Sequence, residues 1–312
     1  MSSFVADALA SGKQALKQLI GERSFNTVRA YRHFWLSRWR GKQPLFVHQM
    51  GKVGSTTLVK SLKASSLGRQ LVIYQTHFLS PEGMAFVERL EEDGYGGRDR
   101  MPDRTKRFLA NCRVWSRHLA TGAFNTQRLR VISMVRDPVA TNLSGYFYNA
   151  HWWPQALQED CRQRAPGHLE QLRAHFLAHY PHHVPLTWFD MEMKTVFGID
   201  VFATPFDAEQ GYQIYRGERA DLLVLKLEKL EQAAAPALAE FLGLDHLTLL
   251  RVNEGADKWY APLYKEFTRV VQLPDSYLDE IYTSPAIRYF YDAGEIKAFR
   301  ERWSKAIRQP AL

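Results

Sequence analysis

The feature that most constrains the fold is a glycine-bearing loop that follows an apolar run at residues 45–47. A segment with helical character begins just after this loop and covers about residues 56–64. A strand, a glycine turn and a helix start together form a phosphate cradle, because the first N–H groups of a helix have no partner inside it. Gly51 and Gly54 let the backbone approach an anion closely, since neither has a Cβ. We therefore expect this loop to bind a phosphorylated ligand.

The order of residues in the loop distinguishes two classes of phosphate-binding protein. The loop of nucleotide triphosphatases reads G-x-x-x-x-G-K-[ST], with the lysine directly after the second glycine. Here Lys52 comes two residues before Gly54, and no glycine stands at Val47, five residues before the lysine. The order therefore disfavours a loop that hydrolyses ATP or GTP. Taken alone, the loop also fits an ordinary glycine turn between a strand and a helix.

A second phosphate-binding element is predicted after the apolar run at residues 131–135, which is typical of a buried parallel strand. Arg136 follows this run directly, and Pro138 suits the first turn of a helix. Ser144 lies eight residues after Arg136, about two helical turns along. A guanidinium fork with a hydroxyl suits a phosphate monoester, so we expect both side chains to converge on one anion. An Arg-Asp pair that caps a helix is the structural alternative.

Together, the two elements resemble the sulfotransferases that use 3'-phosphoadenosine 5'-phosphosulfate (PAPS). Their 5'-phosphosulfate loop is similar to Lys52, Val53, Gly54, Ser55, Thr56 and Thr57, although proline usually precedes the lysine and here it is Gly51. Their 3'-phosphate is held by a pair similar to Arg136 and Ser144. The resemblance implies an α/β fold of the P-loop NTPase-like sulfotransferase type, with a central, mostly parallel sheet flanked by helices. It also implies PAPS as sulfuryl donor, 3'-phosphoadenosine 5'-phosphate (PAP) as product, and no metal.

Sulfuryl transfer to a hydroxyl also needs a group that stabilises charge on the bridging oxygen and a base that removes the acceptor proton. Lys52 is the candidate for the first role, and a histidine is the first choice for the second. His118 follows a predicted strand end at residues 113–116 and resembles the strand-end base of cytosolic sulfotransferases. His77 follows the predicted strand at residues 69–75. His118 is preferred for its place between the two phosphate motifs. His77, a carboxylate base and a purely structural histidine remain alternatives.

From about residue 45 to 303 the chain also resembles a bacterial family of capsular polysaccharide synthesis proteins. The stretches that carry this resemblance are residues 188–201, 205–207 and 223–228, and Asn253 followed by Lys258-Trp259-Tyr260, which is similar to that family's Asn…Lys-Trp-Tyr signature. The resemblance implies that Lys258 reaches the 3'-phosphate from a C-terminal loop, with a buried structural turn as the alternative. It implies a carbohydrate or glycolipid acceptor, in a bacterial capsular or surface polysaccharide.

The length of 312 residues and the composition of the chain favour one large α/β domain. We predict a catalytic domain over residues 44–312, preceded by an N-terminal helical extension over residues 1–43. The net charge of +8 suits an anionic ligand or surface. Cys112 and Cys161 have no metal or redox spacing, which fits a reducing compartment. No apolar stretch approaches the roughly 20 residues of a membrane span, and no secretory signal is recognisable, so a cytoplasmic location is expected.

Alternating strands and helices are expected along the rest of the chain. The predicted helices cover residues 81–90, 104–112, 151–195 and 232–242, the loop covers residues 91–102, and a late strand covers residues 221–226. His175 and His179 have the i, i+4 spacing of zinc ligands, but no H-E-x-x-H motif accompanies them. A solvated surface is the preferred interpretation of this pair.

The N-terminal helical extension carries tryptophans among arginines, at Arg32, Trp35 and Trp39. Such a helix either docks on its own domain or lies on an anionic membrane surface, which would place the protein peripherally at the inner membrane. Docking on the domain is preferred.

Two rival functions remain for the whole chain. One is a nucleotide-dependent kinase on a P-loop fold, which the position of Lys52 disfavours. The other is a non-catalytic glycan- or membrane-binding module, supported only by charge and aromatic residues. Nucleic-acid binding rests on net charge alone, so no nucleic acid is expected as a partner.

Overall fold

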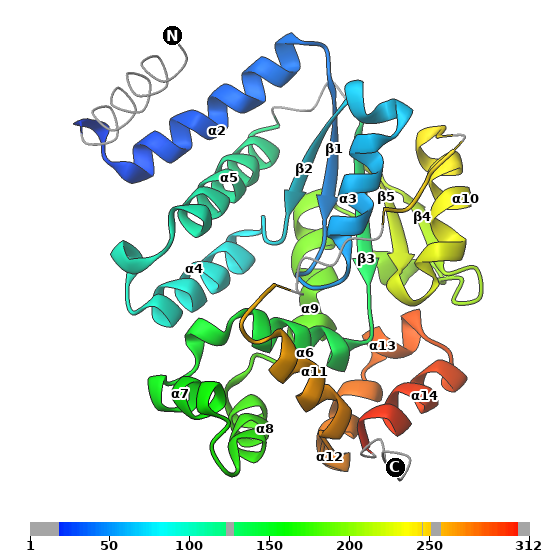
Figure 1. Cartoon of the computed structure of the whole chain (residues 1–312). Helices are drawn as coiled ribbons and strands as arrows, with labels where there is room; N and C mark the ends of the chain where they lie inside the picture. The colour runs from blue at the N-terminus through cyan, green and yellow to red at the C-terminus, as the bar shows by residue number, and fades with distance from the viewer. Residues whose placement is uncertain (1–18, 123–127, 245, 251–256, 305–312) are drawn as a thin grey trace.

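In the computed structural model, which describes residues 19–122, 128–244, 246–250 and 257–304, a five-stranded sheet runs through the centre of the molecule (Figure 1). Its strands, in the spatial order β2-β1-β3-β5-β4, are β1 (Gln43–His48), β2 (Leu71–Thr76), β3 (Leu129–Val135), β4 (Tyr212–Arg216) and β5 (Ala220–Lys226). All neighbouring pairs are parallel except β4 and β5. The expected α/β class with a central, mostly parallel sheet flanked by helices is confirmed.

The apolar runs of the sequence form the three central strands. The side chains of Leu45, Phe46 and Val47 in β1 have no exposed surface, and neither do residues 222–225 in β5. Strands that are covered on both faces read as continuous apolar runs, which is why these strands could be predicted. The edge strand β4 was not expected, because glutamine and arginine interrupt its short apolar pattern.

Successive strands are added to the sheet on opposite sides of β1, so a topological switch point lies between β1 and β3. From β1 the chain continues to β2 on one side, whereas β3 and then β5 lie on the other side. In register, Phe46 of β1 lies opposite Val131 of β3. In open α/β sheets, ligands bind outside the carboxyl ends of the strands at such a switch point. The glycine loop follows β1 and Arg136 follows β3, so both predicted phosphate elements begin at this switch point.

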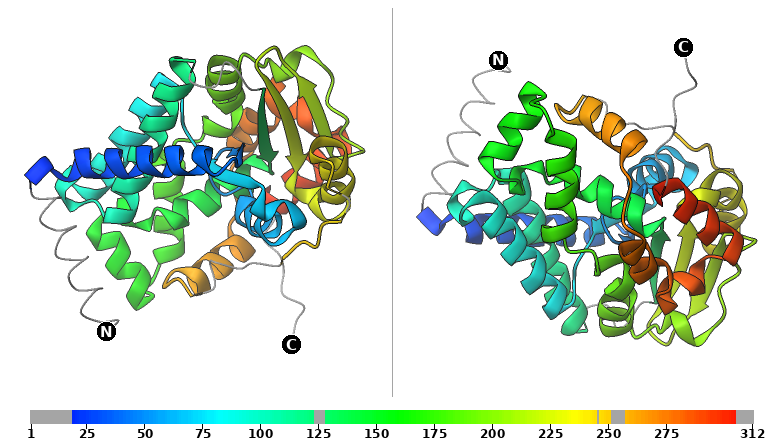
Figure 2. Two further views of the ribbon diagram at one scale, coloured as in Figure 1. Left: turned by 90° about the horizontal axis from the view of Figure 1, so that it is seen from above. Right: turned by 90° about the horizontal axis from the view of Figure 1, so that it is seen from below.

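Helices cover both faces of the sheet (Figures 1 and 2). On one face lie α3 (Ser55–Ala64) and α10 (Leu230–Leu242), and the latter ends at Gly243 in the left-handed conformation. On the other face, α5 (Asp103–Ala120) and the π-helical segment η4 (Asp190–Phe197) reach β1. Trp115 and Phe197 meet the ring of Phe46 there, at centroid distances of 5.6 and 6.1 Å.

The strand end predicted at residues 113–118 is wrong. This segment is the second half of α5, a single helix from Asp103 to Ala120. Its buried residues Leu109, Cys112, Trp115 and Leu119 recur every three or four positions, which is the period of a helix that lies on a sheet. The predicted helix at residues 104–112 was therefore too short.

The predicted loop at residues 91–102 is wrong for its first part, because α4 (Pro81–Tyr95) continues to Tyr95. Gly94 stands inside this helix, where a Cβ would lie 1.7 Å from the indole of Trp152. The glycine therefore permits close packing between α4 and the short helix η3 (Ala150–Trp152) and does not mark a loop.

The remaining helices gather below the carboxyl edge of the sheet in Figure 1. The first is α6 (Pro138–Tyr148), which begins at the expected Pro138. The helices expected within residues 151–195 are α7 (Gln155–Gln163), α8 (His168–His179) and α9 (Val184–Phe189), and the C-terminal ones are α11 (Ala261–Val270), α12 (Asp275–Tyr282), α13 (Pro285–Phe290) and α14 (Ala293–Ser304).

The N-terminal part of the described chain is α2 (Glu22–Trp39), which packs along α5. Lys106 of α5 pairs with Glu22 at 2.8 Å. The boundary between an extension and a catalytic domain at residue 43 remains a prediction. Across the described ranges, none of the helices has the length and apolar character needed to cross a membrane.

Candidate active site

The glycine loop has the tight curvature expected of an anion-binding turn. Gly54 is the N-cap of α3 and has φ 86°, and Lys52 has φ 70°. Two reasons favour glycine at position 54. The positive φ is one that other residues rarely adopt, and a Cβ at this position would lie 2.5 Å from the side chain of Leu227. No side chain caps the start of α3. The first turn of α3 therefore presents its N-terminal end at the switch point of the sheet.

The other residues of the loop have two roles: one packs in the core, and the others carry hydroxyl groups that can donate hydrogen bonds. Val53 is fully buried and holds the loop to the core, whereas Thr56 and Thr57 are partly exposed on the first turn of α3. Ser55 is buried, and its Oγ accepts hydrogen bonds from Gln49 Nε2 at 2.8 Å and Gln75 Nε2 at 2.9 Å. With both acceptor positions of the hydroxyl used, its proton remains the group to donate to a ligand.

Arg136 connects the two phosphate elements directly. Its guanidinium donates a 2.9 Å hydrogen bond to the backbone carbonyl of Lys52. The side chain thus crosses from the end of β3 to the loop after β1. Ser144 lies on α6 and is partly exposed. The next residue, Gly145, packs beside the Lys52 side chain, since a Cβ there would lie 3.9 Å from Lys52 Cγ. The structure therefore brings Lys52, Arg136 and the Ser144 turn of α6 together.

The ammonium group of Lys52 rests on an aromatic side chain. Its Nζ lies 4.3 Å from the ring centroid of Tyr148, the last residue of α6. Tyr148 is 43% exposed, so this cation–π contact is at the surface of the site. The position of the lysine between the loop and α6 leaves its charge at the carboxyl edge of the sheet.

His77 lies at the same edge, directly after β2. Its Nδ1 donates to the carbonyl of Gln49 at 2.8 Å, and a carbonyl can only accept, so Nε2 is the basic nitrogen of the neutral ring. Burial lowers the pKa of His77 from 6.5 to about 4, and the positive charge of Lys52 acts in the same direction. His77 is therefore neutral at neutral pH, as a general base must be.

His118 lies at the opposite edge of the sheet. It belongs to the last turn of α5, where its ring meets Tyr31 of α2 at 4.9 Å. The neighbouring carbonyl of Leu119 accepts from Arg219, and Arg219 immediately precedes β5. The end of α5 is thus beside the amino ends of the strands, away from the glycine loop. The strand end predicted before His118 is wrong, because residues 113–118 belong to the helix α5. The place of His118 between the two phosphate motifs in the sequence, for which it was preferred, therefore does not bring it to the glycine loop.

Lys258 stands in an exposed turn before α11, and its carbonyl accepts from Ala261 N at 2.8 Å. The turn rests on the end of α6, since Tyr260 lies 6.3 Å from Phe147. Trp259 is also exposed, and the guanidinium of Arg162 lies 4.8 Å from the centroid of its ring. The turn is therefore at the surface, and the alternative of a buried structural turn is wrong. Asn253 of the predicted signature lies outside the described residues.

Two buried carboxylates support this edge, and the first of them was not predicted. Glu192 of η4 has no exposed surface and accepts from His48 Nε2, from the backbone N–H groups of Leu79 and Ser80, and from Ser80 Oγ, at 2.8–3.1 Å. It therefore ties the end of β1 to the start of α4. The only available sequence signal was a carboxylate inside an apolar helical stretch.

The second buried carboxylate is Asp137, which caps α6 next to Arg136. Its two oxygens accept from Tyr282 at 2.7 Å and from Trp303 at 2.8 Å, both from the C-terminal helices. Burial raises the pKa of Asp137, and the Tyr282 and Trp303 hydrogen bonds oppose this shift. The C-terminal helices thereby fix the direction in which Arg136 leaves the sheet.

A line of aromatic rings continues from Tyr148 along the same edge. Tyr95 at the end of α4 stacks on His151 at 4.1 Å with an interplanar angle of 19°, and Trp152 follows. All of these rings are at least partly exposed. Glu91 Oε2 lies 3.7 Å from His151 Nε2, and neither atom has a hydrogen-bond partner. Partly exposed aromatic rings form a surface on which a sugar ring could stack.

The two histidines with metal-ligand spacing serve other contacts. His175 lies 2.9 Å from the hydroxyl of Tyr146, and its ring meets that of His179 at 4.7 Å. Within the described ranges, no group of three or more histidine, cysteine or acidic residues is placed to hold a metal ion.

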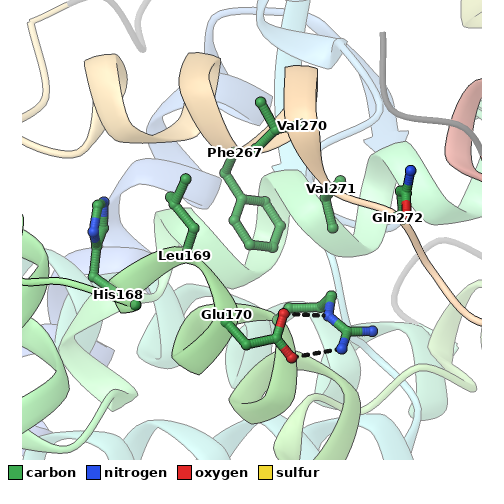
Figure 3. Close-up of a pocket in the computed structure, with 9 residues that line it drawn as sticks. His168, Leu169, Glu170, Phe267, Val270, Val271 and Gln272 are labelled. Carbon is green, nitrogen blue, oxygen red and sulfur yellow. Dashed lines mark hydrogen bonds and ion pairs between the residues drawn. The ribbon is translucent and has the colours of Figure 1, made fainter. Parts of the chain in front are cut away.

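A hollow of about 560 Å³ lies elsewhere, between the start of α8 and the end of α11 (Figure 3). Its lining includes Phe267, Val271 and the pair Glu170–Arg173, whose charges already neutralise each other through two hydrogen bonds. None of the predicted phosphate-binding residues lines it. We therefore assign the candidate active site to the carboxyl edge of the sheet and not to this hollow.

Comparison with known proteins finds one similarity, in the C-terminal half of the chain. Residues 182–292 match the model of a family described as "putative capsular polysaccharide synthesis protein". This segment contains Glu192, β5 and Lys258, whereas the glycine loop and Arg136 precede it. The resemblance expected for residues 45–303 is thus confirmed for residues 182–292. No curated protein and no solved structure matches the chain.

Proposed function

We propose that the protein is a PAPS-dependent sulfotransferase with a P-loop sulfotransferase fold, which transfers a sulfuryl group to a carbohydrate hydroxyl in capsular or surface polysaccharide synthesis. The observation that carries this proposal is the contact of Arg136 with the Lys52 loop at the switch point of the sheet. It puts two cationic side chains and a helix N-terminus beside each other, and a ligand with two separate phosphate groups needs that arrangement.

The residues present fit the two ends of PAPS. Lys52, the hydroxyl of Ser55 and the start of α3 would hold the 5'-phosphosulfate, and Arg136 with Ser144 would hold the 3'-phosphate. Lys258, from the turn that rests on α6, is a further candidate for the 3'-phosphate. The amides of Gln49 and Gln75 support this assignment. Both donate to Ser55 Oγ, so the hydroxyl proton of Ser55 can be donated to an anionic oxygen of the ligand.

The reaction balances with the groups at this edge. The acceptor oxygen would form a bond to sulfur while the bond from sulfur to the bridging oxygen breaks, and PAP leaves. Lys52 would stabilise the charge that develops on the bridging oxygen. His77 Nε2 would receive the acceptor proton, since its neutral form persists at neutral pH.

Support for a carbohydrate acceptor comes from two independent observations. One is the line of partly exposed aromatic rings of Tyr148, Tyr95 and His151 beside Lys52. The other is the similarity of residues 182–292 to a capsular polysaccharide synthesis family.

A thermal-shift titration with PAP, PAPS, ATP and AMP, with and without magnesium, tests the proposal. A ligand that binds only the folded protein stabilises it by about 2.7 kcal/mol at a hundredfold excess over Kd. We expect selective stabilisation by PAP that does not depend on magnesium. Stabilisation by Mg·ATP in preference to PAP would instead support the kinase alternative and overturn the proposal.

A further inference from the structure

Exposed apolar side chains are concentrated at the N-terminal end of the described chain, on α2 and just before it. In the described part of the chain, nine large apolar side chains are exposed, and five of them fall in residues 19–39: Leu19 at 82%, Val28 at 54%, Trp35 at 59%, Leu36 at 38% and Trp39 at 84%. Single exposed apolar residues are ordinary on a protein surface, but such a cluster marks an interaction site.

The helix α2 has two faces with different uses. Its inner face contains the buried residues Asn26 and Ala30 and the ring of Tyr31, which meets His118 of α5. The exposed residues have the spacing of a second stripe, at positions 28, 29, 32, 35, 36, 39 and 40. Docking on the domain therefore uses one face only, and the outward stripe remains at the surface.

The charge of the outward stripe has a single sign. Arg29, Arg32 and Arg40 are exposed on it. Residues 23–42 contain five arginines and one lysine but no aspartate or glutamate. A partner of complementary chemistry must therefore be anionic and must also accept Val28, Leu36 and two tryptophans. A bilayer surface with anionic headgroups has both properties, whereas a nucleic acid offers no apolar phase for the aliphatic side chains.

We propose that the outward stripe of α2, formed by Val28, Arg29, Arg32, Trp35, Leu36, Trp39 and Arg40, docks the protein on a membrane surface that contains anionic phospholipid. The helix lies in the plane of the interface. Its tryptophan and aliphatic side chains enter the boundary between headgroups and acyl chains, and its arginines extend to the lipid phosphates. This inference does not depend on the proposed chemistry, because it uses none of the residues at the carboxyl edge.

Flotation of the full-length protein with vesicles tests the proposal. One set is pure phosphatidylcholine and the other contains 30% phosphatidylserine. We expect the protein to float with the anionic vesicles only, with a blue shift of tryptophan emission and with release at high salt. Replacing Arg29, Arg32 and Arg40 together by Gln should lower partitioning roughly a hundredfold at low salt. Trp35→Ser with Trp39→Ser should abolish the blue shift.

Two matched controls make the test specific. The triple variant Arg269→Gln, Arg288→Gln, Lys297→Gln removes the same net charge from exposed positions on other helices, and it should float like the wild type. Trp259→Ser removes an exposed tryptophan away from α2 and should keep the blue shift. Unchanged melting temperatures show that all variants fold.

Three outcomes would overturn the proposal: no flotation with either vesicle, equal flotation with both, or an equal effect of the control charges. A dimer that the Trp39→Ser variant converts to a monomer, without vesicle binding, would assign the stripe to a second copy instead.

Discussion

The guanidinium of Arg136 holds the backbone carbonyl of Lys52 at 2.9 Å, across 84 positions of sequence. Arg136 ends one central strand and Lys52 follows its neighbour, so this hydrogen bond spans the switch point of the sheet. This contact shapes the loop, and the proposed function gives Arg136 a second, separable task, which is to bind a phosphate.

A comparison of PAP with AMP separates these two tasks. AMP lacks the 3'-phosphate, so the wild type should bind PAP more tightly. In Arg136→Ala, we expect the affinity for PAP to fall about 10- to 100-fold, which is the usual effect of losing a charged hydrogen bond, and to approach that for AMP. Calorimetric titration of both ligands measures this. An equal loss for PAP and AMP would mean that Arg136 only shapes the loop.

Lys52 is expected to act in the transition state. Lys52→Ala should lower kcat by about 10²–10³, the usual cost of removing one preorganised donor, with a smaller effect on PAP affinity. The matched control is Lys63→Ala, an exposed lysine in the last turn of α3. Turnover of Lys52→Ala at the wild-type rate would remove the lysine from the mechanism.

The pH dependence should identify the base. Because the pKa of His77 is lowered to about 4 in the folded protein, the acid limb of kcat/KM should lie near pH 4 and not near 6.5. His77→Ala should lower kcat by roughly 10²–10⁴, whereas His118→Ala should leave it nearly unchanged. A large loss in His118→Ala with none in His77→Ala would contradict the placement of the base.

The same shift predicts a stability effect with a defined sign. The unfolded chain binds a proton at His77 below about pH 6.5, whereas the folded chain resists it down to about pH 4. The contribution of the neutral histidine is therefore complete above pH 6.5 and is lost as the pH falls toward 4. Urea unfolding should show a smaller loss of stability over this range in His77→Gln than in the wild type.

Glu192 should matter for stability more than any exposed carboxylate. Glu192→Gln places an amide N–H among the donors from His48, Leu79 and Ser80, so we expect a loss of about 1–3 kcal/mol in the free energy of unfolding. The control Glu209→Gln, at an exposed position, should change it by less than about 0.5 kcal/mol. Equal denaturation curves for the two variants would refute the bridging role.

The aromatic line is expected to hold the acceptor. Tyr95→Ala should raise KM for a glycan acceptor about fivefold to tenfold while the affinity for PAP stays constant, because the ring lies beyond Tyr148 from the phosphate loop. Tyr31→Ala, at the other edge of the sheet, is the control. A parallel rise in the Kd for PAP would show that Tyr95 supports the loop rather than the acceptor.

Local sequence patterns determined the α/β class, the central strands and the position of the glycine loop. The apolar runs at residues 45–47 and 131–135 and the glycines at 51 and 54 act through neighbouring residues, so their structure could be predicted from the chain alone. Where two local patterns competed, the prediction failed. Residues 113–118 have strand-like apolar content, but the helical period of Leu109, Cys112 and Trp115 decided their structure, because it buries these side chains against the sheet.

Only the tertiary structure decided which side chains share the site. His77 and His118 have similar local sequences, yet strand direction puts one at the carboxyl edge and the other beside the amino ends. Glu192 reaches His48 across 144 positions, and Arg136 reaches Lys52 across 84. Such contacts depend on strand order and on the packing of distant helices, which no local period encodes. The sequence by itself therefore specified the central strands and the glycine loop, and the packing of all the elements selected the candidate base and its supports.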